Sequence, residues 1–293
     1  MIGSRRSWHN ECRSLCKLIV RVWKSTLADR LFGHAAELGF YFLFALFPTL
    51  ICGASMLGLV ARSAHQISDA LLGYLSLVVP TSALGAVLKT FNETAAASSS
   101  GKITFGSIAA IWSASVGVSA LQDTLNGVFR LEEKRSYVIA RLEAISLTVL
   151  LIALTAAGLG CMLGGNFVVA FLNRRWPNGL IIVAAGIAVR CLAWLIAACL
   201  LALSFSFLYY WAPDWQVRRW RWLTPGIVFG IAGWLLASFG LRMYIHLFRG
   251  FSVTYGSLGA VIALLTWLYF SGLMLLLGAE IDVVIEHFQA DTG

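Results

Sequence analysis

Ionisable side chains are rare in this sequence, so the few that interrupt its apolar stretches are the first candidates for chemistry. Only 12% of its 293 residues are charged, and 59% are hydrophobic. Arg190, Arg242 and His246 lie within or beside long apolar stretches. Because guanidinium groups bind phosphate in a bidentate manner, these three residues predict an anion site. Arg190 is also compatible with a side chain that extends to a membrane interface, and Arg242 and His246 with interfacial anchors.

Acidic and amide side chains gather at the opposite ends of the apolar stretches. Glu37 opens the first stretch, Asp123 and Asn126 close the second, and Glu280 lies near the end of the last. If the helices pack together, these groups converge at one depth, which predicts an inner gate or a proton-coupled site. Hydrogen bonds between helices, together with an interfacial charge, are the alternative explanation.

The sequence offers no set of residues that indicates catalysis, a metal or a cofactor. A phosphate-binding loop is missing, so ATP is not expected as a direct energy source. The five histidines are scattered singly, and no carboxylate cluster is suited to two metals. His9, Cys12 and Cys16 share a helical face, but a fourth metal ligand is missing near them. We therefore expect neither an enzyme nor a cofactor.

Six stretches without Asp, Glu, Lys or Arg define the elements that must position these residues. They cover residues 38–61, 103–121, 144–173, 191–213, 222–241 and 250–279. A helix needs about 20 apolar residues to cross the hydrocarbon core. The sequence therefore predicts an all-α, polytopic membrane bundle with about six transmembrane helices. The expected spans are 35–61, 103–126, 139–172, 179–211, 223–248 and 256–282, within a transmembrane domain of residues 35–287.

The two ends of the chain complete the expected domain organisation. Residues 1–34 carry seven lysines and arginines, with apolar residues every three or four positions. This pattern predicts a basic amphipathic segment in the cytosol. Such a helix suits the surface of an anionic leaflet, or it packs on the cytosolic side of the protein itself. Residues 288–293 are expected to form a short tail.

Lysine and arginine predict the orientation in the membrane. With six spans and the amino terminus in the cytoplasm, fourteen of these residues fall on the cytoplasmic side and six on the outer side. Both termini are therefore expected in the cytoplasm. Residues 70–88 are uncharged and either form a further span or lie on the outer surface. A further span would place Arg218, Arg219 and Arg221 outside, which argues against it.

Prolines and glycines mark positions where the predicted helices bend or pack closely. Pro48 lies inside the first span and should kink it, because it removes a backbone hydrogen bond. Pro225 suits the first turn of the fifth span, and Gly226 begins a Gly-x-x-x-Gly pattern that lets helices approach. Gly256 and Gly259, at the start of the last span, are compatible with close packing, a hinge or a flexible entry turn.

Three groups of residues form a pattern that is typical of a known family. They are Tyr41 with Phe47-Pro48 in the first span, Thr224-Pro225-Gly226 at the fifth, and Tyr255-Gly256-Ser257-Leu258-Gly259, Trp267-Leu268-Tyr269 and Leu277-Gly278-Ala279-Glu280 in the last. Over roughly residues 20–285 the chain resembles the YihY/virulence factor BrkB family. The resemblance implies a multi-pass location in the bacterial inner membrane and a link to envelope lipid traffic. Members were also labelled ribonuclease BN, but the His-x-His-x-Asp-His cluster that a zinc nuclease of that name would need is missing here.

Together these expectations predict a protein that transports or flips a lipid or other amphiphilic anion, with membrane lipids as its partners. A non-catalytic scaffold for envelope assembly, with a protein partner, is the main alternative. An enzyme acting on lipid headgroups and a tRNA-processing nuclease fit the residues less well, and nucleic acid is not expected as a partner. The sequence does not predict an oligomeric state.

Overall fold

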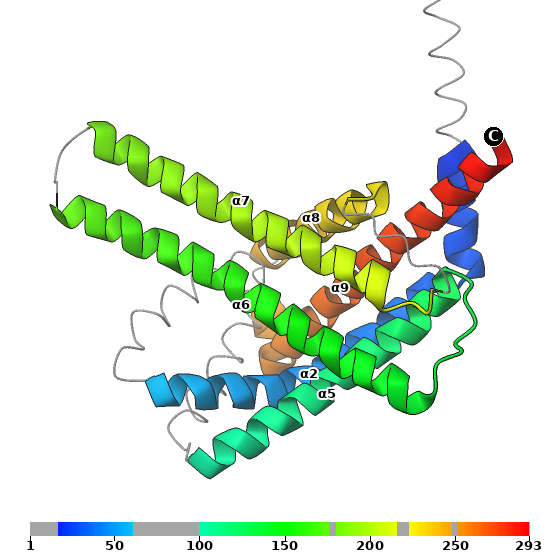
Figure 1. Cartoon of the computed structure of the whole chain (residues 1–293), viewed down its shortest axis with the longest axis horizontal. Coiled ribbons are helices and arrows are strands. Elements are labelled where there is room, and N and C mark those ends of the chain that lie inside the picture. The colour runs from blue at the N-terminus through cyan, green and yellow to red at the C-terminus, as the bar shows by residue number, and fades with distance from the viewer. Residues whose placement is uncertain (1–16, 61–99, 176–179, 216–222, 248–250, 293) are drawn as a thin grey trace, which may run out of the picture.

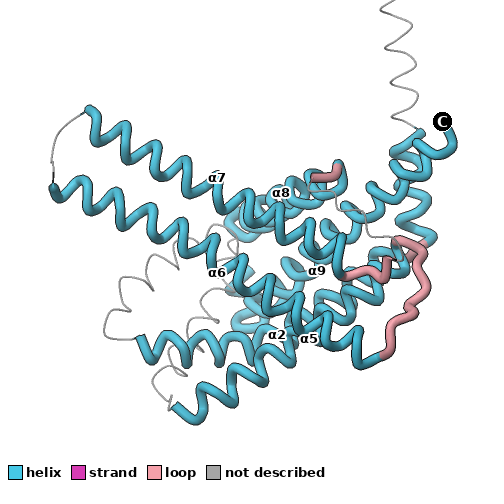
Figure 2. Tube along the Cα trace, in the orientation of Figure 1, coloured by secondary structure: helices cyan, strands magenta, loops and turns pink. Residues whose placement is uncertain are grey.

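The computed structural model describes residues 17–60, 100–175, 180–215, 223–247 and 251–292, which form helices joined by loops (Figure 1, Figure 2). The six long helices are α2 (Leu31–Val60), α5 (Ser100–Val128), α6 (Tyr137–Arg175), α7 (Leu180–Trp211), α8 (Pro225–Leu247) and α9 (Phe251–Thr292). A shorter helix covers residues 17–28 and leads directly into α2. No strand occurs in these described ranges.

Length and composition suit these helices to a membrane. Within the described part of the chain, the segments long and apolar enough to span one are Tyr137–Gly165, Ala184–Trp211, Pro225–Leu247 and Gly259–Phe288, and Leu31–Leu46 is a shorter apolar helix. Large apolar side chains face outward from the bundle; Leu236 of α8, for example, has 71% of its surface exposed. Hydrocarbon accepts such surfaces, whereas in water they mark interaction sites or aggregation. The expected all-α membrane bundle is confirmed.

The helices pack in pairs around α9. α2 lies against both α5 and α9, α6 lies against α7, and α8 lies against α9. Figure 1 shows α6 and α7 side by side as a long hairpin, with α9 crossing the middle of the molecule. The described core takes side chains from all six helices, and Leu31, Leu125 and Leu276 are fully buried in it.

One end of the bundle collects the polar loops, and we call it the polar end. It contains residues 25–34, 126–136, 212–215, 224–226 and 280–287, which are linked by hydrogen bonds and electrostatic interactions. α5 ends there in a left-handed turn, in which Arg130 has a φ of 55° and the next N–H donates to the Asn126 carbonyl. This arrangement satisfies a carbonyl that the end of the helix would otherwise leave unpaired.

α8 and α9 approach very closely at the polar end. A methyl group on Gly226 would lie 2.0 Å from the Gly278 carbonyl oxygen, and one on Gly278 would lie 2.4 Å from the Tyr209 hydroxyl. Asp282 fixes the same contact by accepting hydrogen bonds from the Thr224 hydroxyl and the Gly226 N–H. Glycine at both positions lets the two backbones meet.

The last helix begins earlier than the sequence indicates. α9 starts at Phe251, so Gly256 and Gly259 lie inside the helix and the flexible entry turn is wrong as an explanation for them. α2 continues through Pro48 to Val60, and Pro225 is the first residue of α8. Residues 1–16 and the stretch 70–88 lie outside the described residues, as do Arg218, Arg219 and Arg221.

Replacing Gly226 by alanine is expected to destabilise the protein by about 2 kcal/mol or more, because the added methyl group forces α8 and α9 apart. The measurement is the thermal unfolding midpoint of the purified protein in detergent. Gly160→Ala in α6 is the matched control, since its methyl group would meet nothing within 4 Å, and it should leave the midpoint unchanged or raised. Equal midpoints for the two variants would contradict the close contact.

Candidate functional site

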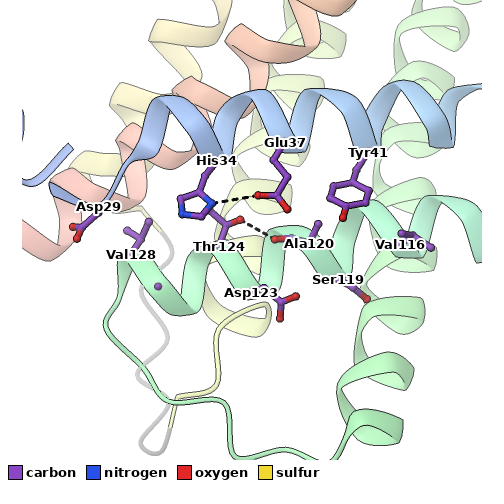
Figure 3. Close-up of a pocket in the computed structure, with 11 residues that line it drawn as sticks. Asp29, His34, Glu37, Tyr41, Val116, Ser119, Ala120, Asp123, Thr124 and Val128 are labelled. Atoms are coloured by element: carbon purple, nitrogen blue, oxygen red, sulfur yellow. Dashed lines mark hydrogen bonds and ion pairs between the residues drawn. The ribbon is translucent and has the colours of Figure 1, made fainter. Parts of the chain in front are cut away.

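A pocket between α2 and α5 at the polar end brings together residues that are far apart in the sequence (Figure 3). Its volume is about 430 Å³, which falls in the range of small-ligand sites. The polar lining consists of Asp29, His34, Glu37 and Tyr41 from the α2 side and Ser119, Asp123 and Thr124 from α5. Within the described part of the chain, no three His, Cys, Asp or Glu side chains are placed to hold a metal ion.

Ionisable side chains from both helices give this pocket its chemical character. His34 Nδ1 lies 3.5 Å from Glu37 Oε2, one turn along α2, and Figure 3 shows both side chains pointing toward α5. Asp123 lies on the α5 side and interacts electrostatically with Glu37. Imidazole and carboxylate groups so placed can bind and transfer protons. Glu37 and Asp123 are two of the four residues expected at an inner gate, so the structure brings half of that set together.

Arg141 of α6 contacts Ser119, which lines this pocket. Its guanidinium group donates to the Ser119 hydroxyl at 3.0 Å and to the carbonyl oxygens of Ser115 and Trp112, each at 3.3 Å. The group also lies 4.6 Å from the centre of the Trp112 ring, within the range of a cation–π interaction. Because these partners are neutral, Arg141 brings a positive charge beside the acidic pocket.

Asn126, expected in the same gate, takes part in a separate hydrogen-bond network. Its amide nitrogen donates to Glu133 Oε2 at 2.7 Å, and its carbonyl oxygen accepts from the Asp214 N–H at 2.8 Å. Arg135 completes the network by donating to both carboxylate oxygens of Glu133 and to Glu143, and it lies 3.8 Å from Asp214. These contacts join the α5–α6 loop to the segment that follows α7. Asn126 does not line the pocket.

The Arg135 guanidinium favours the ionised form of Glu133. Its hydrogen bonds hold the pKa of Glu133 below the ordinary value of 4.5, with a smaller contribution from the Asn126 amide. The same hydrogen bonds raise the pKa of Arg135. This ion pair is difficult to predict from the sequence, because Glu132-Glu133-Lys134-Arg135 has the composition of a solvated loop.

Glu280 lies apart from the pocket, fully buried in α9. Neither of its carboxylate oxygens accepts a hydrogen bond from the described residues. Asp29, Arg130 and His287 interact with it electrostatically, and the Ser25 hydroxyl lies close enough to influence it, although that hydroxyl donates its hydrogen bond to Asp29, at 3.3 Å. A buried ionisable group without hydrogen bonds is costly, which makes Glu280 a functional candidate separate from the pocket.

The residues of the expected outer anion site lie toward the other end of the bundle. Arg190 is exposed on α7, Arg242 is half-buried on α8, and His246 is exposed one turn further along α8. α7 and α8 make little contact with each other. Among the described residues no hydrogen bond or ion pair joins the three side chains. Arg242 and His246 therefore share one face of α8, while Arg190 lies on a different helix.

A long apolar groove runs between α8 and α9, with a volume of about 800 Å³. Small residues at Gly233, Ala237 and Gly240 hollow its α8 wall, and Phe270 and Met274 line the α9 side. The lining extends about 18 Å along each helix, which is more than half of the ~30 Å hydrocarbon core. The charge-free stretches of the sequence do not indicate this groove, although its small residues continue the Gly-x-x-x-Gly pattern of α8.

Two tryptophan–serine hydrogen bonds fix the spacing of the helices that form the groove. Trp234 Nε1 donates to the Ser271 hydroxyl at 2.9 Å, and Trp267 Nε1 donates to the Ser238 hydroxyl at 3.0 Å. Both bonds cross from one helix to the other. These hydrogen bonds therefore hold the two walls of the groove at a fixed distance.

Acid is expected to destabilise the polar end through Glu133. Because the folded-state pKa of Glu133 is depressed, its stabilising contribution is present above the unfolded value near 4.5 and is lost as the pH falls through the folded value. The thermal unfolding midpoint should therefore fall in acid less steeply for Glu133→Gln than for the wild type. Glu132→Gln, at an exposed neighbouring residue, is the control and should follow the wild type. Parallel curves for Glu133→Gln and the wild type would contradict the role of the pair.

Comparison with known proteins gives consistent matches along most of the chain. The chain is 33% identical over 252 residues to the putative ribonuclease-like protein YfkH of Bacillus subtilis (strain 168), which covers 86% of this chain and 89% of that protein. It is 27% identical over 274 residues to a UPF0761 membrane protein of Stenotrophomonas maltophilia (strain R551-3) and over 269 residues to one of Xanthomonas oryzae pv. oryzae (strain PXO99A). Each UPF0761 match covers 92% of this chain but only 60% of the relative.

The family assignment rests on a family model that matches most of the chain. No solved structure matches the chain. The family model described as virulence factor BrkB matches residues 22–293, a range that includes all six long helices, the pocket and the groove. This chain therefore belongs to the virulence factor BrkB family and is a multi-pass bacterial membrane protein.

Proposed function

We propose that this protein moves a lipid or other amphiphilic anion between the two surfaces of the membrane. The observation that carries the proposal is the apolar groove between α8 and α9. Its length of about 18 Å suits an acyl chain, because one leaflet accounts for about half of the ~30 Å hydrocarbon core. The groove is lined almost entirely by apolar side chains, so it suits the tail of an amphiphile and not its headgroup.

The α8 wall supplies a place for an anionic headgroup at the end of the groove. Arg242 and His246 flank Tyr244 and Ile245, which line the groove. A half-buried guanidinium group recognises phosphate with directional hydrogen bonds. In this proposal the polar end faces the cytoplasm, as the lysine and arginine distribution indicates, and Arg242 lies toward the outer leaflet. Arg190 adds positive charge to the same side of the membrane.

The pocket at the polar end supplies a candidate for coupling to protons. It combines the His34–Glu37 pair with Asp123, and such groups change their charge when they bind or release a proton. We assign no catalytic residue to the chain and propose that it is not an enzyme. The ribonuclease-like name belongs to the Bacillus relative.

A proteoliposome assay with a fluorescent phosphatidylglycerol tests the proposal. Gly240→Phe should slow lipid movement about tenfold or more, because nothing lies within 4 Å of a methyl group at that position and the aromatic ring would fill the groove. Gly160→Phe on α6 is the matched control, since that position is also open, and it should keep the wild-type rate. The double variant Arg190→Gln/Arg242→Gln should abolish movement.

Two results would contradict transport by this groove. One is a wild-type protein that moves no lipid, which would favour a membrane scaffold. The other is an unchanged rate in Gly240→Phe, which would place any lipid path elsewhere. The folded state of each variant is checked by its thermal unfolding midpoint, so that a loss of movement is not mistaken for a loss of structure.

A further inference from the structure

The short helix of residues 17–28 has three distinct faces. The first faces the bundle: Thr26 is only 1% exposed, and Ser25 interacts with Glu280 of α9. Figure 1 shows this helix at the carboxyl-terminal part of α9, running across the direction of α2. The turn between the two helices includes Arg30, which has a left-handed φ of 51°. The helix is therefore held against the polar end along one side only.

The second face is apolar and exposed. Ile19, Trp23 and Leu27 follow one another at intervals of four residues, with 64%, 58% and 52% of their surfaces exposed. Residues four apart lie on one side of a helix, so the three side chains form a stripe. Phe32 of α2 continues the stripe through an edge-to-face contact with Trp23, with ring centres 6.2 Å apart. The stripe has no packing partner among the described residues that would remove it from solvent.

The third face is basic and lies next to the apolar stripe. Lys17, Arg21 and Lys24 are spaced so that they share one side of the helix, and all three are exposed. With Val20 they line a shallow depression on the surface. A helix with an apolar face beside a lysine- and arginine-rich face lies flat in the headgroup region of an anionic membrane. Each such basic residue strengthens binding about fivefold.

We propose that residues 17–28 bind the anionic lipid surface next to the polar end, and that this binding keeps Glu280 covered. The proposal does not depend on lipid transport. A membrane surface takes both faces at once, because the basic side chains reach the anionic headgroups while the apolar stripe enters the acyl boundary. Because Ser25, Thr26 and Asp29 lie on the opposite side of the segment, lipid binding presses this side against α9 and excludes water from Glu280.

The experiment uses the full-length protein, without its native cysteines, in nanodiscs. An environment-sensitive fluorophore is attached at Ile19→Cys, and its quenching by spin-labelled lipid is measured. Strong quenching is expected in an equal mixture of phosphatidylcholine and phosphatidylglycerol, and weak quenching in phosphatidylcholine alone. The variant Lys17→Gln/Arg21→Gln/Lys24→Gln should lower the equilibrium constant between the membrane-bound and the free helix about 100-fold. The same fluorophore at the exposed Tyr137→Cys position is the control and should not respond to these three substitutions.

A second measurement follows Glu280 itself. A water-soluble carbodiimide should leave Glu280 unmodified in discs that contain phosphatidylglycerol and should modify it at least several-fold more in the triple variant, as read by mass spectrometry. The exposed Glu132 is the control and should react equally in both proteins. Quenching at Ile19→Cys that does not change with lipid charge would overturn lipid recognition. Equal protection of Glu280 in the wild type and the triple variant would overturn the covering role.

Discussion

Hydrocarbon around the chain is the constraint on which the rest of the structure depends. A charged side chain in the bilayer core is costly unless it reaches an interface or a partner, and backbone groups must be satisfied within the helices. The polar end shows both consequences. Arg135 joins Glu133 of the α5–α6 loop to Glu143 of α6, and Asp282 caps the start of α8 through Thr224 and Gly226.

This constraint separates two kinds of site in the same bundle. Polar groups gather between α2 and α5 near the polar end, which produces the acidic pocket with His34, Glu37 and Asp123. Between α8 and α9, by contrast, small residues leave an apolar groove. Glu280 belongs to neither site. Its side chain is ionisable, yet it is buried and accepts no hydrogen bond from the described residues. It lies next to the segment of Ser25 and Asp29 instead.

The helices were predictable from the sequence because charge-free stretches of sufficient length report directly on the solvent around them. Which residues form each site was less predictable. Asp123 and Asn126 lie one turn apart, yet the course of the α5–α6 loop brings Asn126 to Asp214 and leaves only Asp123 at the pocket. Such a difference depends on how helices rotate against one another, which hydrophobic patterns in a uniformly apolar span do not encode. The groove could not be predicted for the same reason, since Gly240 lines a groove only because α9 packs next to α8.

The central claim is that the bundle crosses a membrane with its polar end on one side and Arg242 and His246 toward the other. Single cysteines at Tyr137 and His246, both exposed, test it in a protein without its native cysteines. A membrane-impermeant maleimide added to intact spheroplasts should label His246→Cys, and should label Tyr137→Cys only after the membrane is opened. Labelling of both positions from the same side would contradict the account.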